Sequence, residues 1–86
     1  METDGQLLSA FVAGDQKAFA ELVGRHADWV WGCALRQGKD SALAEDITQG
    51  AFLLLAKKAA SLKDRSSVQG WLFRVVLFLA RDARKL

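Results

Sequence analysis

The chain has 86 residues, of which 51% are hydrophobic and 26% charged, and a formal net charge of +2. This length allows one domain with a modest core, and the composition is typical of a soluble globular protein. The lack of proline and the scarcity of alternating Val, Ile and Thr argue against a β-rich fold. The single cysteine, Cys33, excludes an internal disulfide and suits a reducing cytoplasm.

Neither end of the chain nor any apolar segment indicates export or a membrane. The N-terminus is acidic and lacks the basic-then-apolar order of a signal peptide. No apolar run approaches the ~18 residues that a membrane span needs. We therefore expect a cytoplasmic protein without a membrane partner.

Charge is distributed unevenly along the chain. Residues 1–62 carry six basic against eight acidic side chains, whereas residues 63–86 carry six basic against two acidic ones. The basic C-terminal end indicates contact with a polyanion. The alternative is a basic helix end that complements its own macrodipole. Charge alone leaves both interpretations open.

The first half of the chain predicts two helices. A short helix over 4–13 ends at Gly14, and Asp15 can cap a second helix that reaches Gln37, with Gly38 as its stop. Glycines inside the second helix would permit close packing of another helix; they are Gly24 and Gly32. The apolar positions of the second helix recur at i, i+3, i+4 and i+7: Phe19, Leu22, Val23, His26, Val30, Cys33 and Ala34.

The second half predicts two further helices. Asp40 or Ser41 can cap the third, over 42–62, and Ser66 with Gln69 fits a capping box at the start of the fourth. The core stripe expected on the third helix is Ala44, Ile47, Ala51, Phe52, Leu55, Ala59 and Leu62, and that on the fourth is Val68, Leu72, Val75, Val76, Leu79 and Ala83. The prediction is one all-α, compact four-helix domain over residues 1–86.

One face of the third helix is left over once its core stripe is assigned. It carries Asp46, Gln49, Gly50, Leu53 and Lys57. A single apolar residue ringed by polar ones is typical of a helix-docking site, although lone exposed leucines are common and often carry no function. This face is a candidate for binding a protein partner.

The fourth helix combines cations and aromatic rings on the side opposite its core stripe. The side chains on this face are Gly70, Arg74, Leu77, Arg81, Arg84 and Lys85, flanked by Trp71, Phe73 and Phe78. Cations that neutralise phosphates beside rings that stack on bases are typical of single-stranded DNA binding. The alternative is that the rings pack in the core, which is favoured for Trp71 and about equally matched for Phe73 and Phe78.

The sequence contains no set of residues that predicts catalysis. His26 lies on an apolar stripe with no Cys, Asp or His at ligand spacing around it, and Cys33 fits a small core residue. There is no glycine-rich phosphate loop. We therefore expect neither an enzyme nor a bound cofactor or metal.

Three blocks resemble conserved region 2 of ECF-type sigma factors, which belong to the sigma-70 family of RNA polymerase subunits. In chain order they are Gly14-Asp15-x-x-Ala18-Phe19-x-x-Leu22, Ala44-Glu45-Asp46-Ile47-Thr48-Gln49-x-x-Phe52, and Trp71-Leu72-Phe73-Arg74-Val75 followed by Ala80-Arg81-Asp82-x-Arg84-Lys85. Each block is weak alone. Together they are specific, because their order and spacing also fit and they cover almost the whole chain.

The resemblance implies two binding functions, in transcription initiation. Asp46, Gln49, Gly50, Leu53 and Lys57 would dock on the clamp helices of the polymerase β′ subunit, with an anti-sigma factor as a further partner. The loop from Lys63 to Ser67 would capture a base flipped from the non-template strand of the promoter minus-ten element. The residues implied to contact this DNA are Lys63, Arg65, Ser66, Ser67, Trp71, Arg74, Phe78, Arg81, Arg84 and Lys85.

The sequence also departs from the family pattern. Phe78 stands where many ECF factors have asparagine, so a stacking surface replaces a hydrogen-bonding side chain. No residue of the family's helix-turn-helix domain for the minus-thirty-five element is present, which indicates an excised domain or a truncated protein. Two rival hypotheses remain: a helical protein-interaction module without DNA binding, and an unrelated helix-turn-helix protein that reads duplex DNA.

Overall fold

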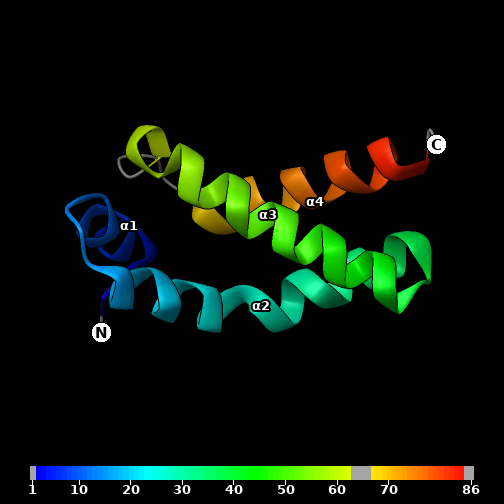
Figure 1. Cartoon of the computed structure of the whole chain (residues 1–86), viewed down its shortest axis with the longest axis horizontal. Helices are drawn as coiled ribbons and strands as arrows, with labels where there is room; N and C mark the ends of the chain where they lie inside the picture. The colour runs from blue at the N-terminus through cyan, green and yellow to red at the C-terminus, as the bar shows by residue number, and fades with distance from the viewer. Residues whose placement is uncertain (1, 63–66, 85–86) are drawn as a thin grey trace.

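The computed structural model describes residues 2–62 and 67–84, which form four helices and, within those ranges, no strand. The helices are α1 (Asp4–Val12), α2 (Gln16–Gly38), α3 (Ser41–Leu62) and α4 (Val68–Arg84) (Figure 1). The all-α, four-helix prediction is confirmed. None of these four helices is long and apolar enough to cross a membrane, as far as the described ranges extend.

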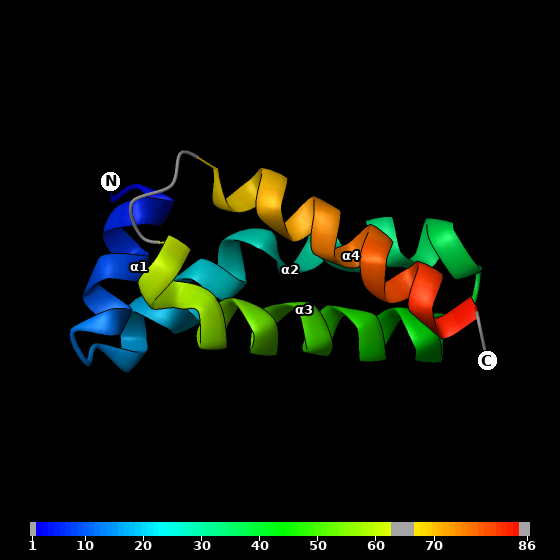
Figure 2. The same cartoon turned by 90° about the horizontal axis from the view of Figure 1, so that it is seen from above.

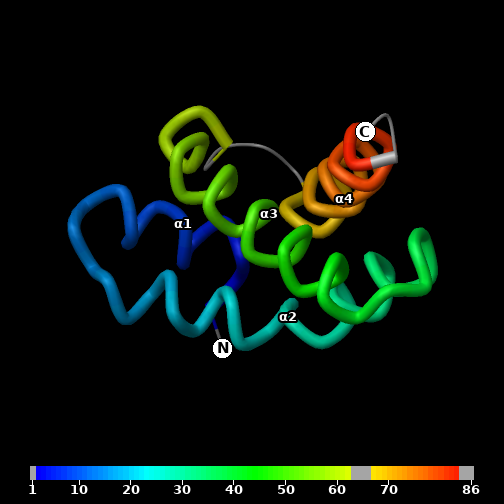
Figure 3. The backbone as a smooth tube through the Cα atoms, turned by 45° about the vertical axis from the view of Figure 1, so that its right-hand side comes forward, coloured from blue at the N-terminus to red at the C-terminus, as the bar shows by residue number. Residues whose placement is uncertain are grey.

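The two long helices form the frame on which α1 and α4 pack. Helix α2 contacts each of the other three helices, and so does α3. The short α1 lies across the first turns of α2 and the last turns of α3, whereas α4 runs toward the opposite end of the molecule (Figures 1 and 2). In Figure 3, α4 lies on the outside of this frame, so one long side of α4 is free of other helices.

The core lies between the helices along the predicted stripes. All seven residues of the α3 stripe are buried, as expected from their spacing. On α4 the buried positions are Val68, Leu72, Val76 and Ala80, whereas Val75 and Leu79 are only partly buried. Ala80 replaces Ala83 as the last core position, because Ala83 is half-exposed.

Residues next to the helices set where each helix begins or ends. The Asp15 carboxylate accepts hydrogen bonds from the backbone of Lys17 at 3.0 Å and Ala18 at 3.3 Å, and Asp40, rather than Ser41, caps α3 in the same way. The predicted stop at Gly38 is wrong. Helix α2 includes Gly38, and Lys39 ends it with φ 56°, donating its backbone N–H to Leu35 at 2.7 Å.

The start of α4 also differs from the prediction. The helix begins at Val68, and the Ser67 hydroxyl oxygen accepts a hydrogen bond from the Gly70 backbone at 2.9 Å. Ser67 is therefore the capping residue, in place of Ser66, which lies outside the described residues. The expected role of the interior α2 glycines is wrong as well, because no other helix comes within 4 Å of a Cβ placed at Gly24 or Gly32.

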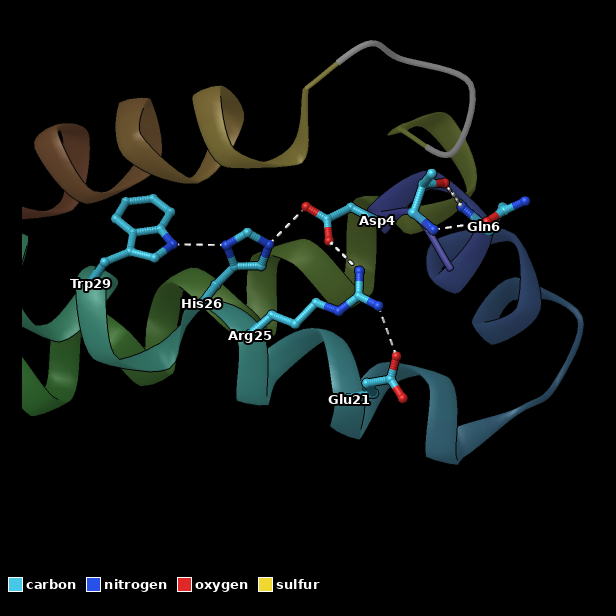
Figure 4. A network of polar contacts seen from close by, with 7 residues as sticks. Asp4, Gln6, Glu21, Arg25, His26 and Trp29 are labelled. Carbon is cyan, nitrogen blue, oxygen red and sulfur yellow. Dashed lines mark hydrogen bonds and ion pairs between the residues drawn. The ribbon is translucent and has the colours of Figure 1, made fainter. Parts of the chain in front are cut away.

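Helix α1 is held to α2 by a polar network that the sequence did not reveal (Figure 4). The Trp29 indole N–H donates to His26 Nδ1 at 2.7 Å, and His26 Nε2 lies 2.8 Å from the Asp4 carboxylate. Because an indole nitrogen only donates, Nδ1 must accept, and the ring proton on Nε2 donates to Asp4. Arg25 also pairs with Asp4, at 3.3 Å, so two side chains of α2 fasten the first turn of α1.

Candidate functional site

Four of the five predicted polymerase-binding residues of α3 are exposed. Asp46, Gln49 and Lys57 are exposed, and Leu53 is 65% exposed. Gly50, the fifth, is partly buried. A Cβ at Gly50 would lie 3.3 Å from the Leu79 side chain of α4, so Gly50 is part of the α3–α4 contact.

An apolar groove runs along the exposed α3 face, between α2 and α3. Its cavity has a volume of about 400 Å³. The residues that line it, here called the α2–α3 groove, are Phe19, Val23, Ala27, Thr48, Gln49, Phe52, Leu53 and Ala56. Leu53 stands at the edge of a hydrophobic surface and is therefore not an isolated exposed leucine. A contiguous apolar surface of this kind marks a protein-binding site more often than a single residue does.

The α2 wall of this groove is the part that the sequence analysis missed. Phe19, Val23 and Ala27 recur every four residues, beside the deeper positions Leu22 and His26, and are only partly buried. The wide stripe on α2 was the available signal, because it holds more apolar positions than one neighbouring helix can cover. The Thr48 hydroxyl donates to the Ala44 carbonyl at 2.8 Å, which leaves its methyl group for the groove.

Exposed aromatic rings and arginines share the outer side of α4. Phe78 is 62% exposed and Phe73 is 46% exposed, and Arg74 and Arg81 are exposed as well. These four residues are here called the α4 face. Trp71 is half-buried against the core, as the sequence favoured. The two phenylalanines are therefore available as stacking surfaces. Arg74 and Arg81 lie about one helical turn before and after Phe78.

Several predicted DNA contacts fall outside the described structure. Lys63, Arg65, Ser66 and Lys85 lie outside the described residues, and Arg84 is described only as the last residue of α4. Ser67 is described, and its hydroxyl oxygen accepts a hydrogen bond from the Gly70 backbone at 2.9 Å, so it caps the start of α4. This bond leaves the hydroxyl hydrogen available as a donor.

Two cavities flank the first turn of α4. One, of about 570 Å³, lies toward α2 and includes Trp29, Cys33 and Phe73 in its lining. The other, of about 510 Å³, lies toward the C-terminal end of α3 and includes Lys58 and Arg74. Ser67 and Gly70 line both cavities, so the capped start of α4 is the wall between them.

The described residues do not assemble a catalytic or metal-binding group. His26 is 7% exposed and engaged by Asp4 and Trp29, and Cys33 is buried. No cluster of three or more potential metal ligands occurs within residues 2–62 and 67–84. The chemistry that these surfaces offer is binding, through an apolar groove on one side and a cationic, aromatic helix on another.

Comparison with known proteins agrees with this arrangement. Residues 22–85 match the Sigma-70 region 2 family. The chain is 36% identical over 80 residues to the ECF RNA polymerase sigma factor SigM of Mycobacterium tuberculosis (strain ATCC 25618 / H37Rv), covering 93% of this chain and 41% of that protein. It is 34% identical over 76 residues to the RNA polymerase sigma factor CarQ of Myxococcus xanthus, covering 88% of this chain and 44% of that protein.

The chain thus spans less than half the length of these two relatives. The family match covers helices α3 and α4 entirely and α2 from Leu22 onward, which includes the α4 face and the α2–α3 groove except Phe19. The chain belongs to the sigma-70 family, as an ECF-type region 2 domain.

Proposed function

We propose that this domain acts in transcription initiation by binding RNA polymerase through the α2–α3 groove and promoter DNA through the α4 face. The polymerase contact is the pair of clamp helices of the β′ subunit. The DNA contact is the non-template single strand of the minus-ten element. The observation that carries the proposal is that exposed phenylalanines lie among exposed arginines on α4, apart from the apolar groove.

The groove supports a helical protein partner. A partner helix that lies along the groove would bury the apolar lining, and the Leu53 side chain would pack against that helix. Asp46, Gln49 and Lys57 are exposed along the same helix and can bond to polar groups of the partner. An anti-sigma factor that covers the same groove would exclude the polymerase.

The α4 face supports a strand with unpaired bases. Phe73 and Phe78 offer ring faces on which bases stack, and Arg74 and Arg81 neutralise phosphates. A duplex hides the faces of its bases within the stack, so exposed phenylalanines are better matched to melted DNA. The proposed function therefore includes holding the strand open after melting.

A second candidate function is a protein-interaction module without DNA binding. The groove favours this second function, because a protein partner can occupy the groove without any nucleic acid. A salt series separates the two functions. The first predicts binding of single-stranded minus-ten DNA that weakens with salt, whereas no salt-sensitive binding would leave only the second. Fluorescence anisotropy of a labelled strand, titrated with the 86-residue chain, is the measurement.

A further inference from the structure

Trp31 is an exposed tryptophan of α2 that belongs neither to the α2–α3 groove nor to the α4 face. It is 38% exposed. Trp29, two residues earlier, is half-buried and donates its indole N–H to His26. Two residues correspond to about 200° around a helix, so the Trp31 ring points away from that network. Tryptophan is enriched at protein interfaces, because its large ring contributes contact area while its N–H tolerates water.

Trp31 continues the α2 wall of the α2–α3 groove. Phe19, Val23 and Ala27 line the groove at intervals of four residues, and Trp31 follows Ala27 at the same interval. One helical turn advances about 5.4 Å, so Trp31 lies directly beyond the end of the lining. The apolar surface of α2 therefore extends one turn past the groove.

The α3 wall becomes acidic at the same end of the groove. Helices α2 and α3 run in opposite directions, so this end lies beside the first turns of α3 (Figure 1). The lining residue there is Thr48, and about one turn before it stand the exposed Glu45 and Asp46. Neither carboxylate takes part in the ion pairs found among residues 2–62 and 67–84. One wall thus ends in an indole ring and the other in carboxylates.

This combination of an indole face and carboxylates suits an arginine side chain. The guanidinium group is planar, stacks on the face of an aromatic ring and donates hydrogen bonds to a carboxylate. An apolar partner residue would cover the Trp31 ring but would draw the neighbouring carboxylates out of water without a partner, which is unfavourable. An acidic partner residue would be repelled by Glu45 and Asp46.

We propose that Trp31 and Glu45 form a site at the end of the α2–α3 groove that takes an arginine of the polymerase clamp helices. This inference rests on the proposed docking of those helices in the groove and deepens it, because it adds a residue of α2 and states the chemistry of its contact. An apolar groove alone allows a helix to slide along it. The arginine site sets the position at which the partner helix stops.

Biolayer interferometry with immobilised β′ clamp helices tests the site. Trp31→Leu keeps an apolar side chain without an aromatic face and should weaken binding about tenfold, whereas Trp31→Phe keeps a face and should weaken it about threefold or less. Glu45→Gln should weaken binding and reduce its dependence on salt. Glu2→Gln removes the same charge from an exposed residue ahead of α1, at the far end of α3, and should change neither quantity.

Fluorine NMR tests the same contact without altering the site. The chain has three tryptophans, so labelling with 5-fluorotryptophan gives three signals, and the signal missing from Trp31→Phe belongs to Trp31. Addition of the clamp helices should shift the Trp31 signal. The signals of Trp29 and Trp71 should stay in place, because Trp29 points to the other side of α2 and Trp71 lies on α4.

The outcomes separate this inference from the proposed function. Clamp-helix binding that tolerates Trp31→Leu, equal losses for leucine and phenylalanine, or a Trp31 signal that does not move would overturn the arginine site and leave the proposed docking standing. Failure of the unmodified protein to bind the clamp helices would overturn both. Circular dichroism checks that each variant is folded, and the fluorine signal of Trp31 decides the question if a variant is not.

Discussion

The α2–α3 groove and the α4 face both expose apolar side chains, but their surroundings differ. The groove gathers its apolar residues into one continuous lining, with charged residues at its margin. On α4 the exposed rings alternate with arginines along one helix. A continuous apolar lining matches the apolar face of a protein partner, because contact with that face removes the lining from water. Aromatic rings interleaved with cations match single-stranded DNA, because its bases are aromatic and its phosphates are anionic.

If the two surfaces serve different partners, changes to one should leave the other intact. The largest expected effect is on the groove. Leu53→Asp places a charge against an apolar partner surface and should weaken binding to the β′ clamp helices by roughly 2–4 kcal/mol. Asp46→Ala combined with Gln49→Ala should weaken the same complex by removing polar contacts. Biolayer interferometry with immobilised clamp helices is the measurement.

Arg36→Ala provides the control for these groove variants. Arg36 is exposed on α2 but does not line the groove, so its removal should change the clamp-helix affinity little. Unchanged binding of Leu53→Asp would place the docking surface elsewhere.

The next largest effect is expected on α4. Phe78→Ala removes a ring that is 62% exposed and should weaken binding of single-stranded DNA by ~1–3 kcal/mol. Phe78→Tyr, which keeps a stacking ring, should bind nearly as well as the unmodified chain. Anisotropy at one fixed salt concentration measures both variants. Equal losses for alanine and tyrosine would show that stacking is not what Phe78 contributes.

A third prediction concerns the frame that holds both surfaces. His26→Phe keeps a flat ring but removes the hydrogen bonds to Asp4 and Trp29, and should lower the free energy of unfolding by about 1–2 kcal/mol. Trp29→Phe removes only the indole donor and should cost less. Urea denaturation followed by circular dichroism measures both. Neither variant should alter the affinity for the clamp helices at temperatures where the variant stays folded. A large change in this affinity would indicate that the contact between α1 and α2 influences the groove.

The smallest expected effect belongs to single phosphate contacts. Arg81→Ala should reduce the magnitude of the salt slope for single-stranded DNA by about 0.7 and weaken all sequences alike. Lys17→Ala is the control for charge, because Lys17 is exposed in the first turn of α2 and lines neither of the cavities beside α4. The slope is obtained from titrations at several salt concentrations. A slope that Arg81→Ala leaves unchanged would remove Arg81 from the DNA contact.

Burial along one helix was predictable from the sequence, whereas contacts between helices were not. The seven-residue stripe of α3 was predicted completely, because helical spacing alone determines which side chains share a face. The contact of Gly50 with Leu79 was not predicted, because it depends on where α4 crosses α3. The Asp4–His26 contact joins residues 22 positions apart, and no local spacing indicates such a pair.

The candidate site was predictable to a similar extent. Leu53 was correctly placed on an exposed face, since it lies opposite the core stripe of α3. The sequence left Phe78 open between the core and the outer face of α4, and the structure exposes it. The α2 wall of the groove was not, because Val23 belongs to the same wide apolar stripe as the buried Leu22.

The central claim is that two surfaces of one small domain bind two different partners. A crossed titration tests it most directly: Leu53→Asp and Phe78→Ala, each measured against the β′ clamp helices and against single-stranded minus-ten DNA. The account predicts that Leu53→Asp loses the clamp helices and keeps the DNA, and that Phe78→Ala does the reverse. Losses of similar size for both partners in either variant, with helicity retained, would contradict it.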